Sequence, residues 1–272
     1  NLMGSLTNYG EIALLKHFTK ETAYSPAATL YLALATADPG ETATGASMNE
    51  VANSGSYARI AIAFGAAASR RITQNATSTF AAASGSWGTI THWAIVDSAT
   101  YGAGNVLAYG ALGASKSVIS GNTPSVASGE VYVEITAGNG LTNYFANGFL
   151  DRMFRNQAFT IAATYAALST TTPADAGTNI TEPSGNNYAR PVINANGGGS
   201  PAWGAVGSST VNNANAVAFA TPSGSWGAIT YIVVYDAITT GNAMGFASTT
   251  TQTPGSGDSV SISANGLVIT MA

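Results

Sequence analysis

Cysteine is absent from this chain of 272 residues, and charge is scarce, because Lys, Arg, Asp and Glu together make up only 8% of it. The lack of cysteine excludes disulfides, thiolate metal sites and a cysteine nucleophile. Globular chains usually carry about 25% charged residues, so Ser, Thr, Asn and Gly must fill most of the polar positions. The nine basic residues are scattered and the formal net charge is −4. Nucleic-acid binding, which needs clustered basic side chains, is therefore not predicted.

Long apolar runs are missing as well. No stretch reaches the roughly 20 apolar residues that cross a bilayer. Residues 1–6 lack the basic and apolar regions of a secretion signal. The sequence therefore predicts neither a membrane partner nor export.

What the sequence does contain is an internal duplication. Three motifs occur once in each half and in the same order: LTNY at 6–9 and 141–144, YAR at 57–59 and 188–190, and SGSWG at 84–88 and 223–227. Such self-similarity is the signature of tandem domains. The Gly-Asn-Gly segment at 138–140 is a suitable joint. We predict a first domain at 1–138 and a second copy of it at 139–272.

Each copy is expected to open with a short helix. In the first, Thr7 is a suitable N-cap before the apolar residues Ile12, Leu15 and Phe18. The second has a broader apolar stripe, made of Phe145, Phe149, Leu150, Met153 and Phe154.

After each helix the apolar period changes from helical spacing to alternation. Strands are predicted at 29–34, 60–64, 90–96, 131–135 and 229–235. Gly, Asn, Ser and Pro clusters separate them, as in antiparallel sandwiches. The predicted fold class is mainly β, with two tandem jelly-roll-like β-sandwich domains that each carry a short N-terminal α-helix. The pattern leaves the strand order open.

Histidines give little support for catalysis. His17 lies between Lys16 and Lys20 on the first predicted helix, which indicates a solvated face. His92 has Tyr231 as its counterpart in the second copy, which favours a partly buried amphipathic position over a general base. No further ligands stand at metal-binding spacing. We predict no catalytic residue, no metal and no cofactor.

Two pairs of acidic residues offer alternatives. Asp97 and Asp236 recur at matching positions before a Gly-Asn pair, which suits either a calcium loop or, as we favour, a turn in which the carboxylate accepts backbone N–H groups. Glu130 and Glu134 share one face of a strand. A glycosidase pair is one reading, but the second copy has no such acids, and a solvent-facing pair is favoured.

Aromatic residues supply the only candidates for ligand binding. Trp87 and Trp226 recur within Gly-Ser-Trp-Gly. An exposed indole could stack on a sugar, whereas a buried one would anchor the turn before the next strand. The anchor is the preferred interpretation. Tyr101 is a third weak candidate for binding.

Taken together, LTNY before a helix, ATLYLAL at 28–34, YAR, and WGxIT followed by Asp and Gly-Asn resemble a virion domain of tailed bacteriophages. Proteins of this kind are often labelled tail-fibre-like, and similar β-sandwich modules serve as capsid cement or decoration proteins. The resemblance covers both copies. The second copy departs from it at TYAAL (164–168) and at the glycine-rich GGG (197–199).

The resemblance implies a non-enzymatic structural protein of the virion, assembled in the host cytoplasm. The first hypothesis is a decoration protein that stabilises the head by binding the major capsid protein. It would also bind itself, and a trimer would place six domains in a pseudo-sixfold ring. The alternative is a tail fibre or receptor-binding protein that recognises glycans.

Overall fold

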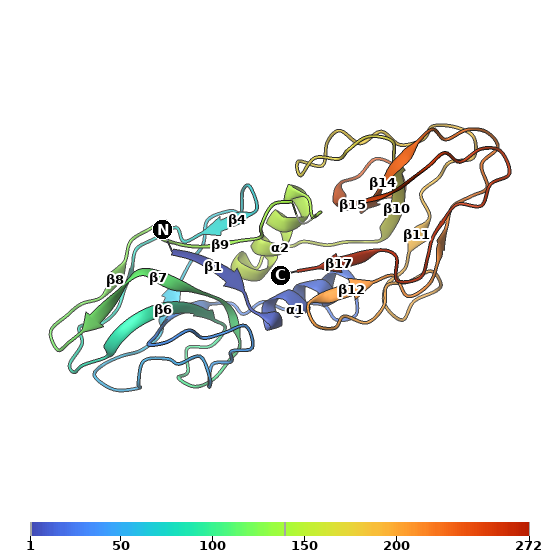
Figure 1. The fold of residues 1–272 in the computed structure, drawn as a ribbon. Coiled ribbons are helices and arrows are strands. Elements are labelled where there is room, and N and C mark those ends of the chain that lie inside the picture. Colours follow the sequence, from blue (N-terminus) through green and yellow to red (C-terminus); the bar gives the residue numbers. More distant parts are fainter. Residues whose placement is uncertain (1, 139, 272) are drawn as a thin grey trace.

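The computed structural model describes residues 2–138 and 140–271. Its regular structure is mainly β-strand, with two helices, which confirms the predicted fold class (Figure 1). The elements of the first half are β1 (Leu2–Leu6), α1 (Asn8–Phe18), β2 (Leu30–Ala35), β3 (Ile60–Ile62), β4 (Arg71–Thr73), β5 (Ser78–Thr79), β6 (Gly88–Val96), β7 (Val106–Val118), β8 (Ser125–Val126) and β9 (Val131–Glu134). Those of the second half are α2 (Asn143–Arg155), β10 (Thr164–Ser169), β11 (Val192–Ile193), β12 (Thr210–Asn212), β13 (Val217–Ala218), β14 (Ile229–Tyr235), β15 (Ala243–Gln252), β16 (Ser261–Ile262) and β17 (Val268–Thr270).

The two copies arrange their strands in the same relative order. In the first, a sheet runs β3-β2-β6-β7-β1-β9-β4, and β5 pairs with β8. In the second, the sheet runs β11-β10-β14-β15, while β12 pairs with β17 and β13 with β16. Among the described residues, the second copy has no strand equivalent to β1, and its large sheet therefore divides between β15 and β17.

Each copy has a short helix near its N-terminal end, as predicted, but in the first copy the strand β1 precedes the helix. This strand pairs antiparallel with β7 and parallel with β9, so its backbone groups are bonded on both sides and extended structure is favoured. The predicted domain boundary includes Asn139, which lies outside the described residues.

The LTNY motif has a clear structural role in both copies. The hydroxyl oxygen of Thr7 accepts a hydrogen bond from the Gly10 N–H (3.3 Å), and that of Thr142 accepts one from the Phe145 N–H (3.4 Å). Each threonine therefore caps its helix, as predicted for Thr7. The same hydroxyls donate to carbonyl groups of β7 and β15, at Val106 and Ala243. One side chain thus begins the helix and attaches it to the sheet.

The helices bury the expected stripes, with one shift. All five predicted apolar residues of α2 are buried. In α1 the buried side chains include Leu14, Leu15 and Phe18, whereas Ile12 is only half-buried at the margin. None of the helices in residues 2–138 and 140–271 could cross a membrane.

The two helices lie side by side at the centre of the molecule, between the two sheets (Figure 1). Each helix region contacts the opposite copy. The N–H of Ala67, just before β4, donates to Asp151 Oδ1 on α2 (2.9 Å). The N–H of Val206, at the matching turn before β12, donates to Glu21 Oε2 just after α1 (2.9 Å). The copies are therefore interlocked by two reciprocal contacts.

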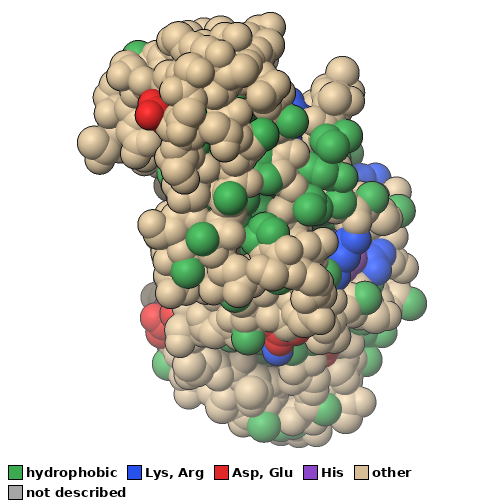
Figure 2. Space-filling model, turned by 90° about the vertical axis from the view of Figure 1, so that its right-hand side faces the viewer, with side chains coloured by type: hydrophobic (Ala, Val, Ile, Leu, Met, Phe, Trp, Pro, Cys, Tyr) green, Lys and Arg blue, Asp and Glu red, His purple; other side chains and the backbone are tan. Residues whose placement is uncertain are grey.

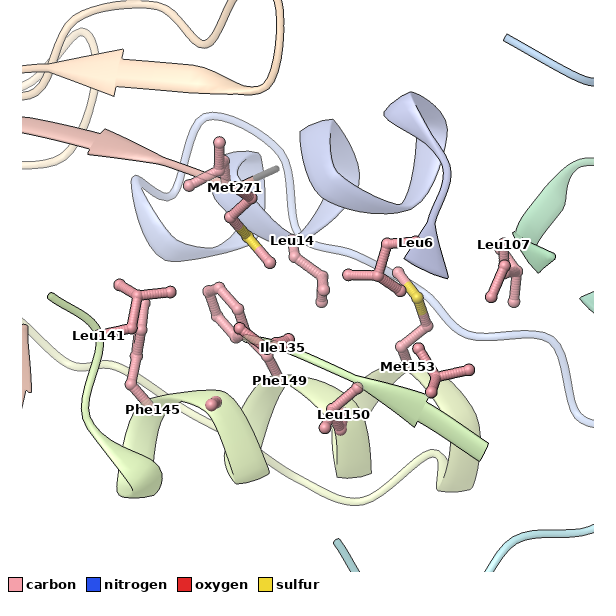
Figure 3. Close-up of a cluster of buried hydrophobic side chains, with 14 of the residues drawn as sticks. Leu6, Leu14, Leu107, Ile135, Leu141, Phe145, Phe149, Leu150, Met153 and Met271 are labelled. Atoms are coloured by element: carbon pink, nitrogen blue, oxygen red, sulfur yellow. The ribbon is translucent and has the colours of Figure 1, made fainter. Parts of the chain in front are cut away.

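A continuous hydrophobic core runs through this interlock. The ring centroid of Phe18 lies 5.1 Å from that of Phe145 and 5.0 Å from that of Trp203, although Phe18 belongs to the first copy and the other two belong to the second. In Figure 3, Leu14 of α1 faces Phe149 of α2. Since each copy completes the core of the other, we expect the chain to unfold as one unit.

Arg70 fixes the connection between the copies. Its guanidinium is buried and donates to the carbonyl groups of Ile135, Thr136 and Leu141. Its backbone N–H donates to Asn147 Oδ1 on α2 (2.8 Å). The chain on either side of the joint is therefore held by hydrogen bonds.

Candidate functional site

The YAR motif of the first copy forms a buried polar network. Arg59 donates two parallel hydrogen bonds to the carboxylate of Glu50, from Nε and Nη2 at 2.8 Å each. Its Nη1 donates to the carbonyl groups of Ser98 and Ala103, also at 2.8 Å. The hydroxyl of Tyr57 donates to Glu50 Oε1 (3.0 Å). The exposed fractions of the Arg59 and Glu50 side chains are only 1% and 4%. Each buried charge therefore needs the other to offset the cost of its removal from water.

The second copy repeats this network. Arg190 pairs with Glu182 and donates to the carbonyl groups of Ala237 (2.7 Å) and Thr240 (2.8 Å). The hydroxyl of Tyr188 donates to Glu182 Oε2 (2.8 Å). In both copies, the arginine holds the loop that follows the central buried strand. The motif therefore fixes a loop, and the acidic partners, which sequence reasoning missed, belong to it.

The same loop is closed from its other side by the recurring aspartates. Asp97 accepts hydrogen bonds from the backbone N–H (2.6 Å) and the side-chain amide (2.7 Å) of Asn105. Asp236 does the same with Asn242, at 2.6 and 2.8 Å. This agrees with a turn rather than a calcium loop. In residues 2–138 and 140–271, no group of three or more acidic or histidine side chains could hold a metal ion.

Trp87 and Trp226 are buried, with exposed fractions of 4% and 3%, so neither ring can serve as a stacking platform. Each indole N–H donates to a backbone carbonyl, that of Gly55 for Trp87 (2.8 Å) and that of Asn186 for Trp226 (2.9 Å). Both therefore occupy the anchor position that the sequence favoured. Of the three candidates for binding, Tyr101 alone exposes a substantial part of its ring (42%).

The aromatic packing around the two tryptophans is also duplicated. The ring of Tyr57 meets that of Trp87 edge-on at 5.2 Å and stacks with Phe80 at 6.2 Å. In the second copy, Tyr188, Trp226 and Phe219 repeat this arrangement at 5.3 and 6.3 Å. The repeated motifs thus meet in one core layer per copy.

The histidines and the remaining acids have structural partners. His17 is half-buried, and its Nε2 lies 2.9 Å from the carbonyl oxygen of Phe159 in the second copy, so the expectation of a solvated face is wrong. The reason is the interlock, which covers this side of α1. His92 is half-buried, as its pairing with Tyr231 predicted. Glu134 pairs with Arg71 on β4 at 2.7 Å.

The buried tyrosines give the protein an expected sensitivity to alkali. Burial raises the pKa of Tyr57 and of Tyr188 well above the ordinary value of 10.0, and the neighbouring Glu50 and Glu182 raise it further. Unfolded tyrosines ionise near pH 10 while the folded ones stay neutral. The stability that these neutral tyrosines contribute is therefore fully present below about pH 10, and it is lost as the pH rises towards their pKa in the folded protein.

We accordingly expect the thermal midpoint to fall between about pH 9 and pH 11, with tyrosinate absorbance appearing together with unfolding. A Tyr101→Phe variant should show the same dependence, because that ring is exposed. Tyrosinate absorbance that rises fully before unfolding would contradict this expectation.

Comparisons with known proteins agree with the duplication. The family model described as podophage GP4 fiber I protein gp80 matches the chain twice, at residues 5–134 and 140–270. No curated protein matches the chain. The two matches together cover nearly the whole sequence and coincide with the two structural copies. This chain therefore belongs to the podophage GP4 fiber I protein gp80 family and is a structural component of a phage particle.

Proposed function

We propose that this chain is a building block of a podophage fibre, located in the tail and not on the head. The observation that carries the proposal is the match of both copies to a fibre family. The structure is consistent with it, because the side chains shared by the two copies pack internally as caps, anchors and loop clamps. Decoration of the capsid through the major capsid protein has no comparable support and becomes the second candidate.

A catalytic role is not part of the proposal. The acid pair considered for glycan cleavage gives such a role no support, because Glu134 forms an ion pair with Arg71. Self-association, with a trimer as one form, remains a prediction of the sequence and is proposed as the way in which fibre subunits would assemble.

The location can be tested on purified particles. Quantitative mass spectrometry should give a copy number close to that of known tail proteins, and an antibody against the chain should label the tail in electron micrographs. A copy number close to that of the major capsid protein, with label over the head, would instead establish the decoration role.

A further inference from the structure

A groove of about 390 Å³ lies beside α1 in the first copy. We call it the α1 groove. The residues that line it are Tyr9, Ile12, Ala13, Lys16, Thr22, Ala23, Tyr24 and Ser25. Its volume falls in the range of pockets that bind small molecules, roughly 300–1,000 Å³.

In the second copy, an aromatic ring covers the corresponding side of the helix. Phe159 lies directly on Gly148 of α2, where an added Cβ would come within 2.2 Å of the ring. Its ring also meets that of Tyr144 at a centroid distance of 5.5 Å. Counted from the LTNY motif, Ala13 takes the place of Gly148, and Tyr24 takes the place of Phe159. Ala13 carries a methyl group where Gly148 has none, so the ring of Tyr24 cannot lie as close to α1 as the ring of Phe159 lies to α2.

The lining of the α1 groove combines apolar faces with uncharged donors and acceptors. Tyr9 is 40% exposed, and its ring offers a flat apolar surface with a hydroxyl at the end. Thr22 and Ser25 are exposed and contribute hydroxyl groups. The ammonium group of Lys16 forms an ion pair with Glu21 at 2.8 Å, so its charge is balanced within the protein. Such a lining matches a neutral molecule that has both an apolar face and several hydroxyl groups.

The wall opposite α1 is held in place. The backbone N–H of Tyr24 donates to His17 Nδ1 (3.2 Å), and its carbonyl accepts from Arg152 Nη2 of α2 (2.6 Å). The N–H of Thr22 donates to the Lys16 carbonyl at the end of α1 (3.3 Å). A site that is ordered before binding loses less conformational entropy when a ligand arrives.

From these observations we infer that the α1 groove binds a neutral saccharide. A pyranose ring would place its C–H face against the ring of Tyr9 and direct its hydroxyl groups to Lys16, Thr22 and Ser25. The inference deepens the proposed fibre function and rests on it only for the source of the sugar, a glycan of the host cell surface.

The test uses the full chain and matched variants of the two copies. A glycan array with neutral and acidic oligosaccharides would identify ligands, and isothermal titration calorimetry with the best neutral one would give Kd. We expect Tyr9→Ala to weaken binding at least about tenfold, equivalent to the loss of one good aromatic contact. The matched Tyr144→Ala variant should bind as the unaltered chain does, because Tyr144 does not line the α1 groove, although its exposed fraction (37%) is close to that of Tyr9.

A second variant, Ala13→Phe, would fill the groove and leave Tyr9 in place, and it should also abolish binding. Circular dichroism would confirm that each variant folds. The inference is overturned if no neutral glycan binds, if only acidic glycans bind, or if Tyr9→Ala and Ala13→Phe bind normally. None of these binding results bears on whether the chain lies in the tail or on the head. A failure of the saccharide proposal can therefore be distinguished from a failure of the fibre proposal.

Discussion

A Phe145→Ala variant is expected to lower the free energy of unfolding of the whole chain by about 3–5 kcal/mol. Phe145 is fully buried, and its ring lies 4.1 Å from that of Phe149 and 5.1 Å from that of Phe18, measured between centroids. Removing it leaves a cavity where the two copies meet. Since the core is continuous across both copies, both should lose stability together.

Denaturant unfolding followed by tryptophan fluorescence would measure this effect, because Trp93 reports on the first copy and Trp203 on the second. We expect one transition, shifted to lower denaturant in the variant. As a control, Ile119→Ala changes a side chain that is 60% exposed and should alter stability by less than about 0.5 kcal/mol. Two separate transitions, of which only that of the second copy shifts, would show that the copies fold independently.

A Glu50→Gln variant is expected to destabilise the protein by about 3–5 kcal/mol, because it leaves the buried charge of Arg59 without a counter-charge. The substitution keeps the shape of the side chain, so packing changes little. The loop that Arg59 holds through the Ser98 and Ala103 carbonyls should also become more mobile. Hydrogen exchange of its amides would detect that change.

The chain offers graded controls for this prediction. Glu182 forms the equivalent pair in the second copy but is 21% exposed, and Glu134 forms a surface pair with Arg71, whose side chain is 43% exposed. Exposed pairs contribute about 0–1 kcal/mol. The expected order of destabilisation is Glu50→Gln, then Glu182→Gln, then Glu134→Gln. Equal losses in all three variants would mean that burial does not decide the strength of these pairs.

Local patterns in the sequence predicted the features that depend on neighbours in the chain. Thr7 before an apolar stripe indicated a helix cap, and the repeated Trp87 and Trp226 indicated anchors. Both have the expected roles in the structure. The acidic partners of the YAR motif were missed, although a signal existed: Glu50 stands seven residues before Tyr57, and Glu182 stands six before Tyr188. The difference of one residue concealed the repeat.

The interlock could not be predicted in this way. The partner of Phe18 is Phe145, more than a hundred residues away, and no periodicity specifies which surfaces of two copies will meet. The same applies to His17, which was expected on a solvated face but contacts the Phe159 carbonyl of the second copy. The strand β1 was missed because its stability comes from pairing with β7 and β9 and not from its own five residues.

Three of the nine basic side chains, those of Arg59, Arg70 and Arg190, are buried. The outer surface is therefore even poorer in charge than the composition indicates. On the face drawn in Figure 2, charged side chains, in blue and red, are few among uncharged atoms. Mobile ions screen exposed charges beyond about 10 Å at 0.1 M salt, but here they find little to screen. Long-range electrostatic attraction would not accelerate the association of such a surface with a partner. The affinity would therefore depend little on salt concentration.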